Sequence, residues 1–321
     1  MNERQAQVTF LSGGTGTPKL LLGIRKFLQD EQLTVIGNTG DDDEFYGLLV
    51  SPDIDTLLYL FSEQLDLTKF WGVKNETFNC LQQIQEQLQM DTWFQLGDKD
   101  LALHLFRNKL LTEGYTLTEI VQEIRKRLQI KATILPMSDA PVRTVLTSIN
   151  GESLSFQEYT VKLREQVAIK NVEYLGATKA KPSPQVLEAI LNAKTIIIGP
   201  SNPITSINPM LAIAGFRKAL EQTTAKIIAV SPIRSGQTFS GPAAKLMQQL
   251  GLAPSPQGIA KLYQKFLGTL IISDQDKEQI EQITALGIKT IATNISLATE
   301  AARTRLAQIV LEEAEIGRNP C

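Results

Sequence analysis

The chain contains 321 residues, of which 43% are hydrophobic and 21% charged, a composition typical of a globular protein with one large domain. Its 32 basic and 34 acidic side chains leave a formal net charge of -2, which gives no general attraction to nucleic acid or to an anionic membrane. We therefore expect neither nucleic acid nor a membrane among its partners. This balance is still compatible with a local anion-binding site.

Cysteine and histidine are scarce, which excludes several common kinds of site. The two cysteines, Cys80 and Cys321, suggest no disulfide framework and belong to no Cys/His metal cluster. A zinc site or a Ser-His-Asp triad would have to use His104, the only histidine. The N-terminus has charged residues but no apolar run typical of a signal peptide. We expect a cytoplasmic, reducing location.

The first elements alternate between strand and helix. Residues 7–12 read as a buried strand, residues 18–30 as a helix and residues 33–39 as a second strand. Thr17 is expected to cap the helix, with Pro18 as its first residue. A strand–helix–strand order of this kind predicts a parallel sheet with right-handed crossovers.

A helical insertion is expected next, over residues 51–130. Its first helix has Ser51 as the N-cap, followed by proline and two acidic residues in the first turn. Further helical patterns cover residues 75–88, 100–111 and 116–129.

The second half returns to sheet. Residues 132–165 read as strand and hairpin material, with Asn150-Gly151 as the turn. Four more strands with intervening helices, and a terminal helix, are expected at residues 193–203, 225–233, 268–274, 288–294 and 296–316. We predict a single α/β domain over residues 1–321: a Rossmann-like, doubly wound, mostly parallel sheet with the helical insertion.

A glycine-rich loop follows the first strand in the segment "SGGTGTPK". It lacks the Walker A spacing, and Lys19 stands where the dinucleotide fingerprint needs its third glycine. Its backbone N–H groups, the helix N-terminus and Lys19 could nevertheless hold an anion. The alternative is a tight strand–helix turn without a ligand.

Acidic residues gather after the second strand and at the start of the next helix. Asp41, Asp42 and Asp43 lie in the first of these places, and Asp53 and Asp55 in the second. Carboxylates from two neighbouring loops could bind a hard cation such as Mg²⁺ that bridges phosphate oxygens. The alternative is a solvated acidic loop with first-turn carboxylates that complement a helix dipole.

Two further segments are weaker signals. The segment "GDKDLALHLFR" places Lys99 at a helix start and His104 about one turn later, and His104 is expected to be packed in the core rather than catalytic. The segment "GPSNP" is typical of an anion cradle made of backbone N–H groups and hydroxyls.

Taken together, these segments resemble the 2-phospho-L-lactate transferase family, which makes the deazaflavin coenzyme F(420). The resemblance runs from Val8 to about Leu311 in the family's order and spacing. The segments that carry it are "SGGTGTPKLL", "NTGDD…SPDIDT", "FWGVKNETF", "LGDKDLALH", "LPMSDAPVRT", "GPSNPITSI", "VSPI" and "SGPAAKLM". It implies a Rossmann-type core with a helical insertion, and a homodimer.

The resemblance also implies a reaction. A phospholactyl or phosphoenolpyruvyl group would pass from a lactyl- or enolpyruvyl-diphospho-guanosine donor to the ribityl hydroxyl of the deazaflavin Fo. GMP would leave, and Mg²⁺ would be the cofactor. Such a transfer needs a metal at a diphosphate, backbone cradles and little acid–base machinery.

Site residues are carried over from the family position by position. Asp55 matches a deazaflavin-contacting, metal-proximal aspartate, expected to orient the acceptor hydroxyl or to hold the metal, and Asp41 matches a metal ligand. The expected substrate-binding residues are Gly13, Gly14, Thr15, Lys19, Asn38, Asp53, Lys99, Ser201, Asn202 and Pro203. Two departures stand out: Ala140 replaces an aspartate found in many members, and residues 43–50 lack a tryptophan common there.

Two other functions compete with the transferase. The first is a non-catalytic, nucleotide-sugar-binding regulator of the related gluconeogenesis-factor family, which shares a similar glycine-rich start. A pure binding protein has less need for clustered carboxylates, which favours the transferase. A nicotinamide oxidoreductase is disfavoured because the third glycine and a hydride-transfer constellation are missing.

Overall fold

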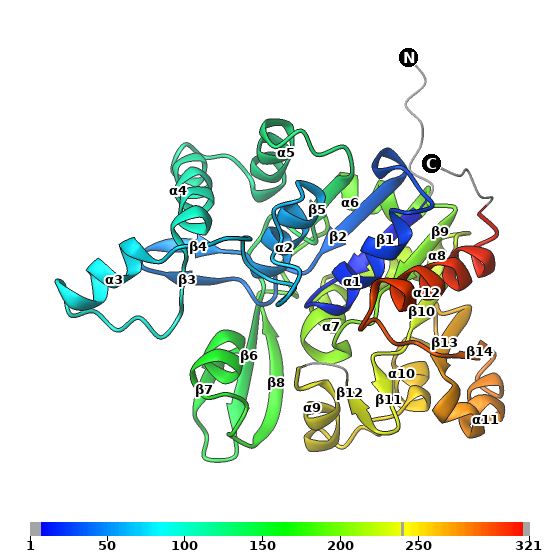
Figure 1. Ribbon diagram of the computed structural model, residues 1–321. Helices are drawn as coiled ribbons and strands as arrows, with labels where there is room; N and C mark the ends of the chain where they lie inside the picture. Colours follow the sequence, from blue (N-terminus) through cyan, green and yellow to red (C-terminus); the bar gives the residue numbers. More distant parts are fainter. Residues whose placement is uncertain (1–7, 239–240, 317–321) are drawn as a thin grey trace.

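A seven-stranded parallel sheet forms the centre of the computed structural model, which describes residues 8–238 and 241–316 (Figure 1). The strand order is β14-β13-β10-β9-β1-β2-β5, and every neighbouring pair is parallel. The strands are β1 (Val8–Ser12), β2 (Leu33–Gly37), β5 (Thr133–Pro136), β9 (Thr195–Ile198), β10 (Lys226–Val230), β13 (Thr269–Ser273) and β14 (Lys289–Thr293). The predicted α/β, Rossmann-like fold class is confirmed.

The sheet is buried on both faces, which explains the continuous apolar strands. Phe10 and Val35 belong to one hydrophobic cluster, while their chain neighbours Leu11 and Ile36 belong to another. This alternation follows from the two-residue period of a strand.

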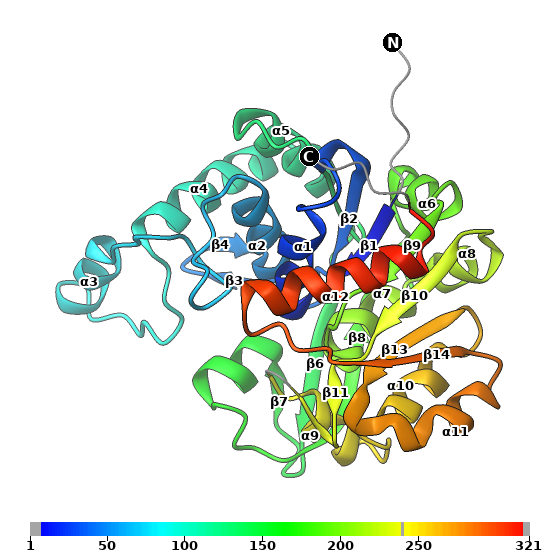
Figure 2. The same cartoon turned by 45° about the vertical axis from the view of Figure 1, so that its right-hand side comes forward.

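Helices cover each face. On one side lie α1 (Gly16–Ile24), α2 (Pro52–Phe61), α5 (Leu117–Arg127) and α12 (Glu300–Glu313), with α1 and α12 crossing in front of the sheet in Figure 2. On the other side lie α6 (Pro184–Leu191), α7 (Asn208–Ala212), α8 (Phe216–Gln222), α9 (Ala243–Gln249), α10 (Pro256–Tyr263) and α11 (Ile280–Thr284).

The topological switch lies at β1. The chain passes from β1 outward to β2 and β5, then returns to β9 on the other side of β1. Ligands of open α/β sheets bind at the carboxyl ends of the strands at such a point. The loops after β1, β2 and β9 therefore border the expected site.

The expected insertion is less helical than its sequence pattern indicates. Beyond α2 it contains α3 (Asn79–Glu86), α4 (Asp98–Thr112) and α5, whereas residues 62–78 and 87–97 form turns and loops. Two of these helices, α3 and α4, extend to the left of the sheet in Figure 1. An unpredicted antiparallel hairpin of β3 (Asp43–Phe45) and β4 (Leu48–Val50) precedes α2.

The predicted hairpin at Asn150-Gly151 is confirmed. It joins β6 (Arg143–Ser148) to β7 (Ser153–Ser155), and β8 (Ile169–Leu175) pairs with β6 on the other side. Gly151 adopts φ +90°, a left-handed conformation that glycine enters without strain. After β10, a shorter hairpin is formed by β11 (Ile233–Arg234) and β12 (Gln237–Thr238).

The start of α1 differs from the prediction. Thr15, not Thr17, is the N-cap, and the helix ends at Ile24 rather than at residue 30. The Thr17 hydroxyl instead lies 2.7 Å from the Ser201 hydroxyl of the loop after β9. A tertiary partner for this side chain thus outcompetes the local capping bond.

Close approach of the loops after β1 and β9 depends on Gly199. A Cβ atom at this position would lie 1.9 Å from Oγ1 and 2.7 Å from Cβ of Thr17. We expect Gly199→Ala to lower the free energy of unfolding by about 1–3 kcal/mol through overpacking. Urea denaturation measures this effect. Gly268→Ala is the control, because its nearest contact would be an ordinary 3.4 Å to the Ile227 carbonyl; equal losses in both variants would contradict the prediction.

Candidate active site at the carboxyl edge of the sheet

Asp53 joins the loops after β1 and β2. Its Oδ1 accepts a hydrogen bond from the Gly14 N–H at 2.6 Å, and its Oδ2 accepts one from the Asn38 amide at 2.9 Å. The Asn38 amide also donates to the Thr205 carbonyl, at 3.2 Å, in the loop after β9. The predicted residues Gly14, Asn38 and Asp53 therefore meet at the switch point.

The two predicted cradles are in direct contact. The Ser201 hydroxyl donates to the Gly13 carbonyl at 2.7 Å and accepts from the Gly13 N–H at 3.3 Å. A Cβ atom at Gly13 would lie 2.5 Å from the Cβ of Ser206, so only glycine allows this approach. In the structure the glycine-rich turn binds the protein's own Ser201 hydroxyl and Asp53 carboxylate.

Asn202 and Pro203 begin the π-helical turn η3 (Pro203–Ile207). The side-chain oxygen Oδ1 of Asn202 accepts from the N–H groups of Ile204 and Thr205, at 3.0 and 3.4 Å, and so caps this turn. Its side-chain NH₂ is buried and has no partner.

Buried polar atoms without a partner gather in these loops. Besides the Asn202 amide they are Ser12 Oγ, Thr39 Oγ1, Asp41 Oδ1, Thr144 Oγ1 and Thr205 Oγ1. Such groups are rare in folded proteins because leaving them unpaired costs about 1–3 kcal/mol each. Their concentration at strand ends indicates a place for a polar ligand.

Four buried carboxylates lie beside these atoms. Burial raises the pKa of Asp42 to about 8 and the pKa of Asp53 to about 6, and neighbouring charge from Asp55 adds to both. Burial and the adjacent Asp53 raise the pKa of Asp41 well above its usual range. These directions follow from the cost of removing negative charge from water.

The fourth carboxylate, Asp55, is paired with Arg107 of α4. Both of its oxygens accept from this guanidinium, with Nη1 3.1 Å from Oδ2. Oδ2 also accepts from the Ser51 N–H at 3.3 Å, and the Ser51 hydroxyl donates to Asp42 at 2.7 Å. Asp55 is therefore buried and paired within this cluster, and its catalytic and metal-binding roles stay predictions.

His104 lies behind this ion pair. Its Nδ1 is 3.1 Å from Arg107 Nη1, and its Nε2 is 3.2 Å from Asp100 Oδ1. Asp100 also accepts a hydrogen bond from the Tyr59 hydroxyl. The imidazole is fully buried, which agrees with the expectation of a packed core histidine.

The charges of this cluster do not balance within the protein. The cluster contains four carboxyl groups, and the two cations that act on it are Arg107 and Arg143. If all four carboxyl groups were ionised, two negative charges would remain without a compensating cation. Among the described residues, no group of three or more His, Cys, Asp or Glu side chains is arranged to hold a metal alone. A divalent cation would fit the charge and would take further ligands from substrate.

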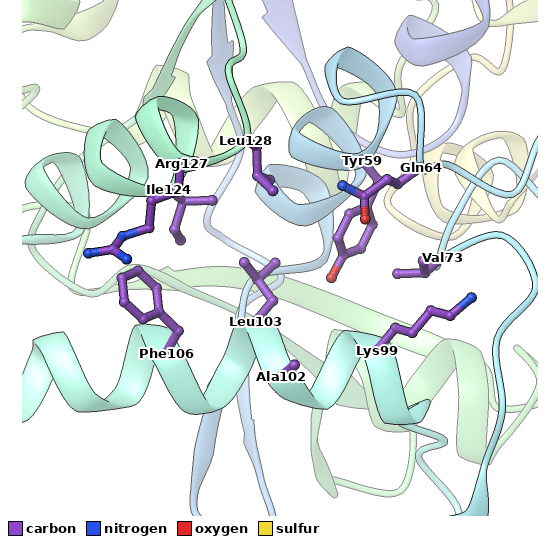
Figure 3. Close-up of a pocket in the computed structure, with 10 residues that line it drawn as sticks. All are labelled: Tyr59, Gln64, Val73, Lys99, Ala102, Leu103, Phe106, Ile124, Arg127 and Leu128. Atoms are coloured by element: carbon purple, nitrogen blue, oxygen red, sulfur yellow. The ribbon is translucent and has the colours of Figure 1, made fainter.

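Two predicted substrate-binding lysines lie elsewhere. The Lys19 ammonium lies 4.9 Å from the centre of the Phe70 ring, and burial and Arg303 lower its pKa. Lys99 donates to the backbone carbonyls of Lys74 and Asn75. It lines a mostly apolar cavity of about 240 Å³ between α2, α4 and α5 (Figure 3). Thr15, also predicted, occupies the N-cap position of α1 without a side-chain capping hydrogen bond.

Arg107 is the functional candidate that the sequence analysis missed. A signal was present, because Asp100, His104 and Arg107 are spaced i, i+4 and i+7 and so share one face of α4. Three polar residues on a buried face indicate a common target. Only the tertiary structure identifies Asp55 as that target.

The sequence matches the family described as 2-phospho-L-lactate transferase CofD over residues 8–311. The chain belongs to this family. A 2-phospho-L-lactate transferase from Methanosarcina mazei is 39% identical over 301 residues, 94% of this chain and 98% of that protein. The phosphoenolpyruvate transferase of Streptomyces griseus is 35% identical, over 96% and 98% of the two chains.

A solved structure has the same fold as this chain. A protein of the UPF0052 family from Bacillus halodurans superposes with a TM-score of 0.65 at 20% identity, covering 96% of this chain and 99% of that one. At this identity the likeness concerns the fold alone. Within residues 8–238 and 241–316, no helix combines the length and apolar character needed to span a bilayer.

The family departure at Ala140 lies in the loop after β5. Its neighbour Asp139 accepts a hydrogen bond from the Thr118 N–H at 2.7 Å, which places it at the start of α5. The Ala140 N–H donates to the Ser138 hydroxyl at 3.1 Å, and its side chain is exposed. The segment therefore supports the insertion through Asp139.

The raised pKa of Asp42 predicts that the protein loses stability as the pH rises. Between about pH 6 and 8 this carboxyl is protonated when folded and ionised when unfolded, so the unfolded state binds fewer protons. The free energy of unfolding then falls by about 1.4 kcal/mol per pH unit from this group. We expect Asp42→Asn to remove that part of the slope in urea denaturation with EDTA. Glu44→Gln, an exposed change in the same hairpin, is the control; an unchanged slope in Asp42→Asn would contradict the assignment.

Proposed function

We propose that this protein transfers a phospholactyl or phosphoenolpyruvyl group from a guanosine diphospho donor to the ribityl hydroxyl of the deazaflavin Fo. The acceptor oxygen forms a bond to the phosphorus that carries the three-carbon acid. The bond from that phosphorus to the bridging oxygen breaks, and GMP leaves. The product is a precursor of coenzyme F(420). The transferase names of the relatives support this proposal.

The observation that carries the proposal is the excess of buried carboxylate beside two backbone cradles. Asp41 and Asp42 follow β2 and Asp53 lies in the first turn of α2, where its carboxylate accepts from the Gly14 N–H, next to the Gly13–Ser201 contact. Negative charge of this kind disfavours a phosphate by itself and favours one that arrives with a cation. A diphosphate with a bound metal has that chemistry.

Mg²⁺ fits the residues present. Asp41 Oδ1 is buried and has no partner, and carboxylate oxygen is the ligand type that Mg²⁺ prefers. Asp41 would hold it, with Asp53 and Asp55 beside it. When bound, Mg²⁺ would neutralise charge on the diphosphate and the leaving GMP.

The chain's own groups orient the reactants. Asp55, whose orientation Arg107 fixes, would orient the acceptor hydroxyl by accepting its hydrogen bond. The unpartnered Asn202 amide and Thr205 hydroxyl are available to donate to phosphate or carboxylate oxygens. Because His104 is sealed behind Arg107, no histidine takes part in proton transfer.

The competing proposal is a nucleotide-sugar-binding regulator. The same cradles would suit such a ligand, but binding alone gives no reason for four buried carboxylates. We also propose a cytoplasmic homodimer, as in the sequence analysis.

The decisive experiment incubates the protein with Fo, the guanosine diphospho donor and Mg²⁺, and follows GMP by chromatography. We expect GMP and a phosphodiester of Fo in equal amounts. Mass spectrometry of the product from competing donors then identifies the three-carbon acid. Tight binding of a nucleotide sugar without GMP release would exclude the transferase.

Asp41→Asn tests the proposed metal ligand. The change keeps the shape of the side chain and removes its charge, so we expect a folded protein with kcat lower by about 10²-fold or more at moderate Mg²⁺. Asp43→Asn is the control, because Asp43 is half-buried in the adjacent hairpin and its oxygen accepts from the Glu44 N–H. Equal activity in the two variants would remove Asp41 from the reaction.

A further inference from the structure

The guanidinium of Arg107 is fully buried and has no solvent contact to offset the cost of burial. Replacing a buried ion pair by apolar side chains is often neutral or stabilising, so stability alone does not account for this arrangement. Its geometry is specific: one group on α4 contacts Asp55 on α2 and the Leu49 carbonyl, 3.2 Å away, on β4. A single side chain therefore links the insertion, the hairpin and the candidate active site.

Arg107 can donate but never accept, which determines the state of His104. Since Nδ1 of His104 lies 3.1 Å from Arg107 Nη1, this nitrogen must be the unprotonated acceptor. Its other nitrogen, Nε2, is then the one that can carry the ring proton; it lies 3.2 Å from Asp100 Oδ1 but makes no hydrogen bond of normal geometry. His104 thus lies between a carboxylate and a guanidinium, and only an unprotonated Nδ1 can accept from the guanidinium.

The contacts of Arg107 restrict its rotation. Nη1 shares its two hydrogens among Asp55 Oδ2, the Leu49 carbonyl and His104 Nδ1, while Nη2 donates to Asp55 Oδ1. A two-point contact fixes the plane of a carboxylate, whereas a lysine would act as a point charge. Asp55 therefore presents its oxygens in one orientation.

We propose that Arg107 is a positioning residue for Asp55 in the transfer reaction and that His104, in its neutral Nε2–H tautomer, aligns the guanidinium. The expected effect on kcat rests on the proposed function. The hydrogen bonds that join His104, Arg107 and Asp55 are tested separately, by a measurement that needs no enzymatic activity. Arg107 acts through Asp55 and contacts neither donor nor acceptor.

Arg107→Lys separates position from charge. The variant keeps a cation but loses the two-point contact, so we expect kcat to fall by about 10²-fold with KM for the donor changed little. Arg127→Lys is the matched control, since Arg127 lies on α5 and its Nε bonds Glu123. Thermal unfolding verifies that each variant is folded. A folded Arg107→Lys protein with wild-type kcat would overturn the proposal.

His104→Asn and His104→Phe test the second part. The asparagine oxygen lies at about the position of Nδ1 and can still accept from Arg107, whereas phenylalanine cannot. We expect His104→Asn to keep kcat within about tenfold of wild type and His104→Phe to resemble Arg107→Lys. Equal kcat in the two folded variants would remove His104 from the positioning role.

The single histidine provides an activity-independent readout. In untagged protein labelled with ¹⁵N-histidine, one residue supplies all imidazole signals. We expect Nδ1 to resonate as an unprotonated nitrogen and Nε2 as a protonated one, and Asp55→Asn to shift the Nδ1 signal through Arg107. A protonated Nδ1, or an Nδ1 signal indifferent to Asp55→Asn, would overturn the proposal. If these signals are as expected but GMP is never released, the proposed function fails and the positioning of Asp55 stands.

Discussion

The buried ion pair between Arg107 and Asp55 is the contact on which the arrangement of the site depends. Desolvating a guanidinium is tolerated only where a carboxylate and further acceptors surround it. Here the acceptors come from α2, from β4 and from His104 on α4 itself. In the observed packing of α4 the guanidinium reaches all of these acceptors, so the same contact that fixes α4 also orients Asp55.

The rest of the site is governed by an imbalance of charge. Arg107 and Arg143 can compensate two of the four buried carboxylates. Burial and the neighbouring carboxylates raise the pKa values of Asp41, Asp42 and Asp53. Meanwhile the glycine-rich turn, a place suited to a phosphate, holds the Asp53 carboxylate. A cation that arrives with a phosphate would compensate the excess negative charge and would give the glycine-rich turn a phosphate to bind. We therefore favour a metal-assisted group transfer over binding alone.

The fold by itself does not distinguish among functions. The Bacillus halodurans protein has the same architecture at 20% identity, and the parallel sheet provides a ligand crevice at its switch point whatever the chemistry. We therefore look for specificity in the loops after β1, β2 and β9 and in Asp55, which Arg107 of α4 holds. The apolar cavity that Lys99 lines lies away from these loops, between α2, α4 and α5.

Sequence alone determined the parts of this protein that depend on local pattern. Continuous apolar strands such as residues 8–12 specify a doubly covered parallel sheet, and Asn150-Gly151 specifies the turn of the separate β6–β7 hairpin, because strand period and backbone freedom act over a few residues. The order of motifs was sufficient to indicate the transferase family.

Only the tertiary structure decided that Thr17 bonds Ser201 instead of capping α1, that Lys19 lies over Phe70, and that Arg107 pairs with Asp55. The partners lie 51 or more positions apart in all three cases. Local pattern cannot identify them, because the partner of a buried polar group is whichever group the packed chain brings within reach.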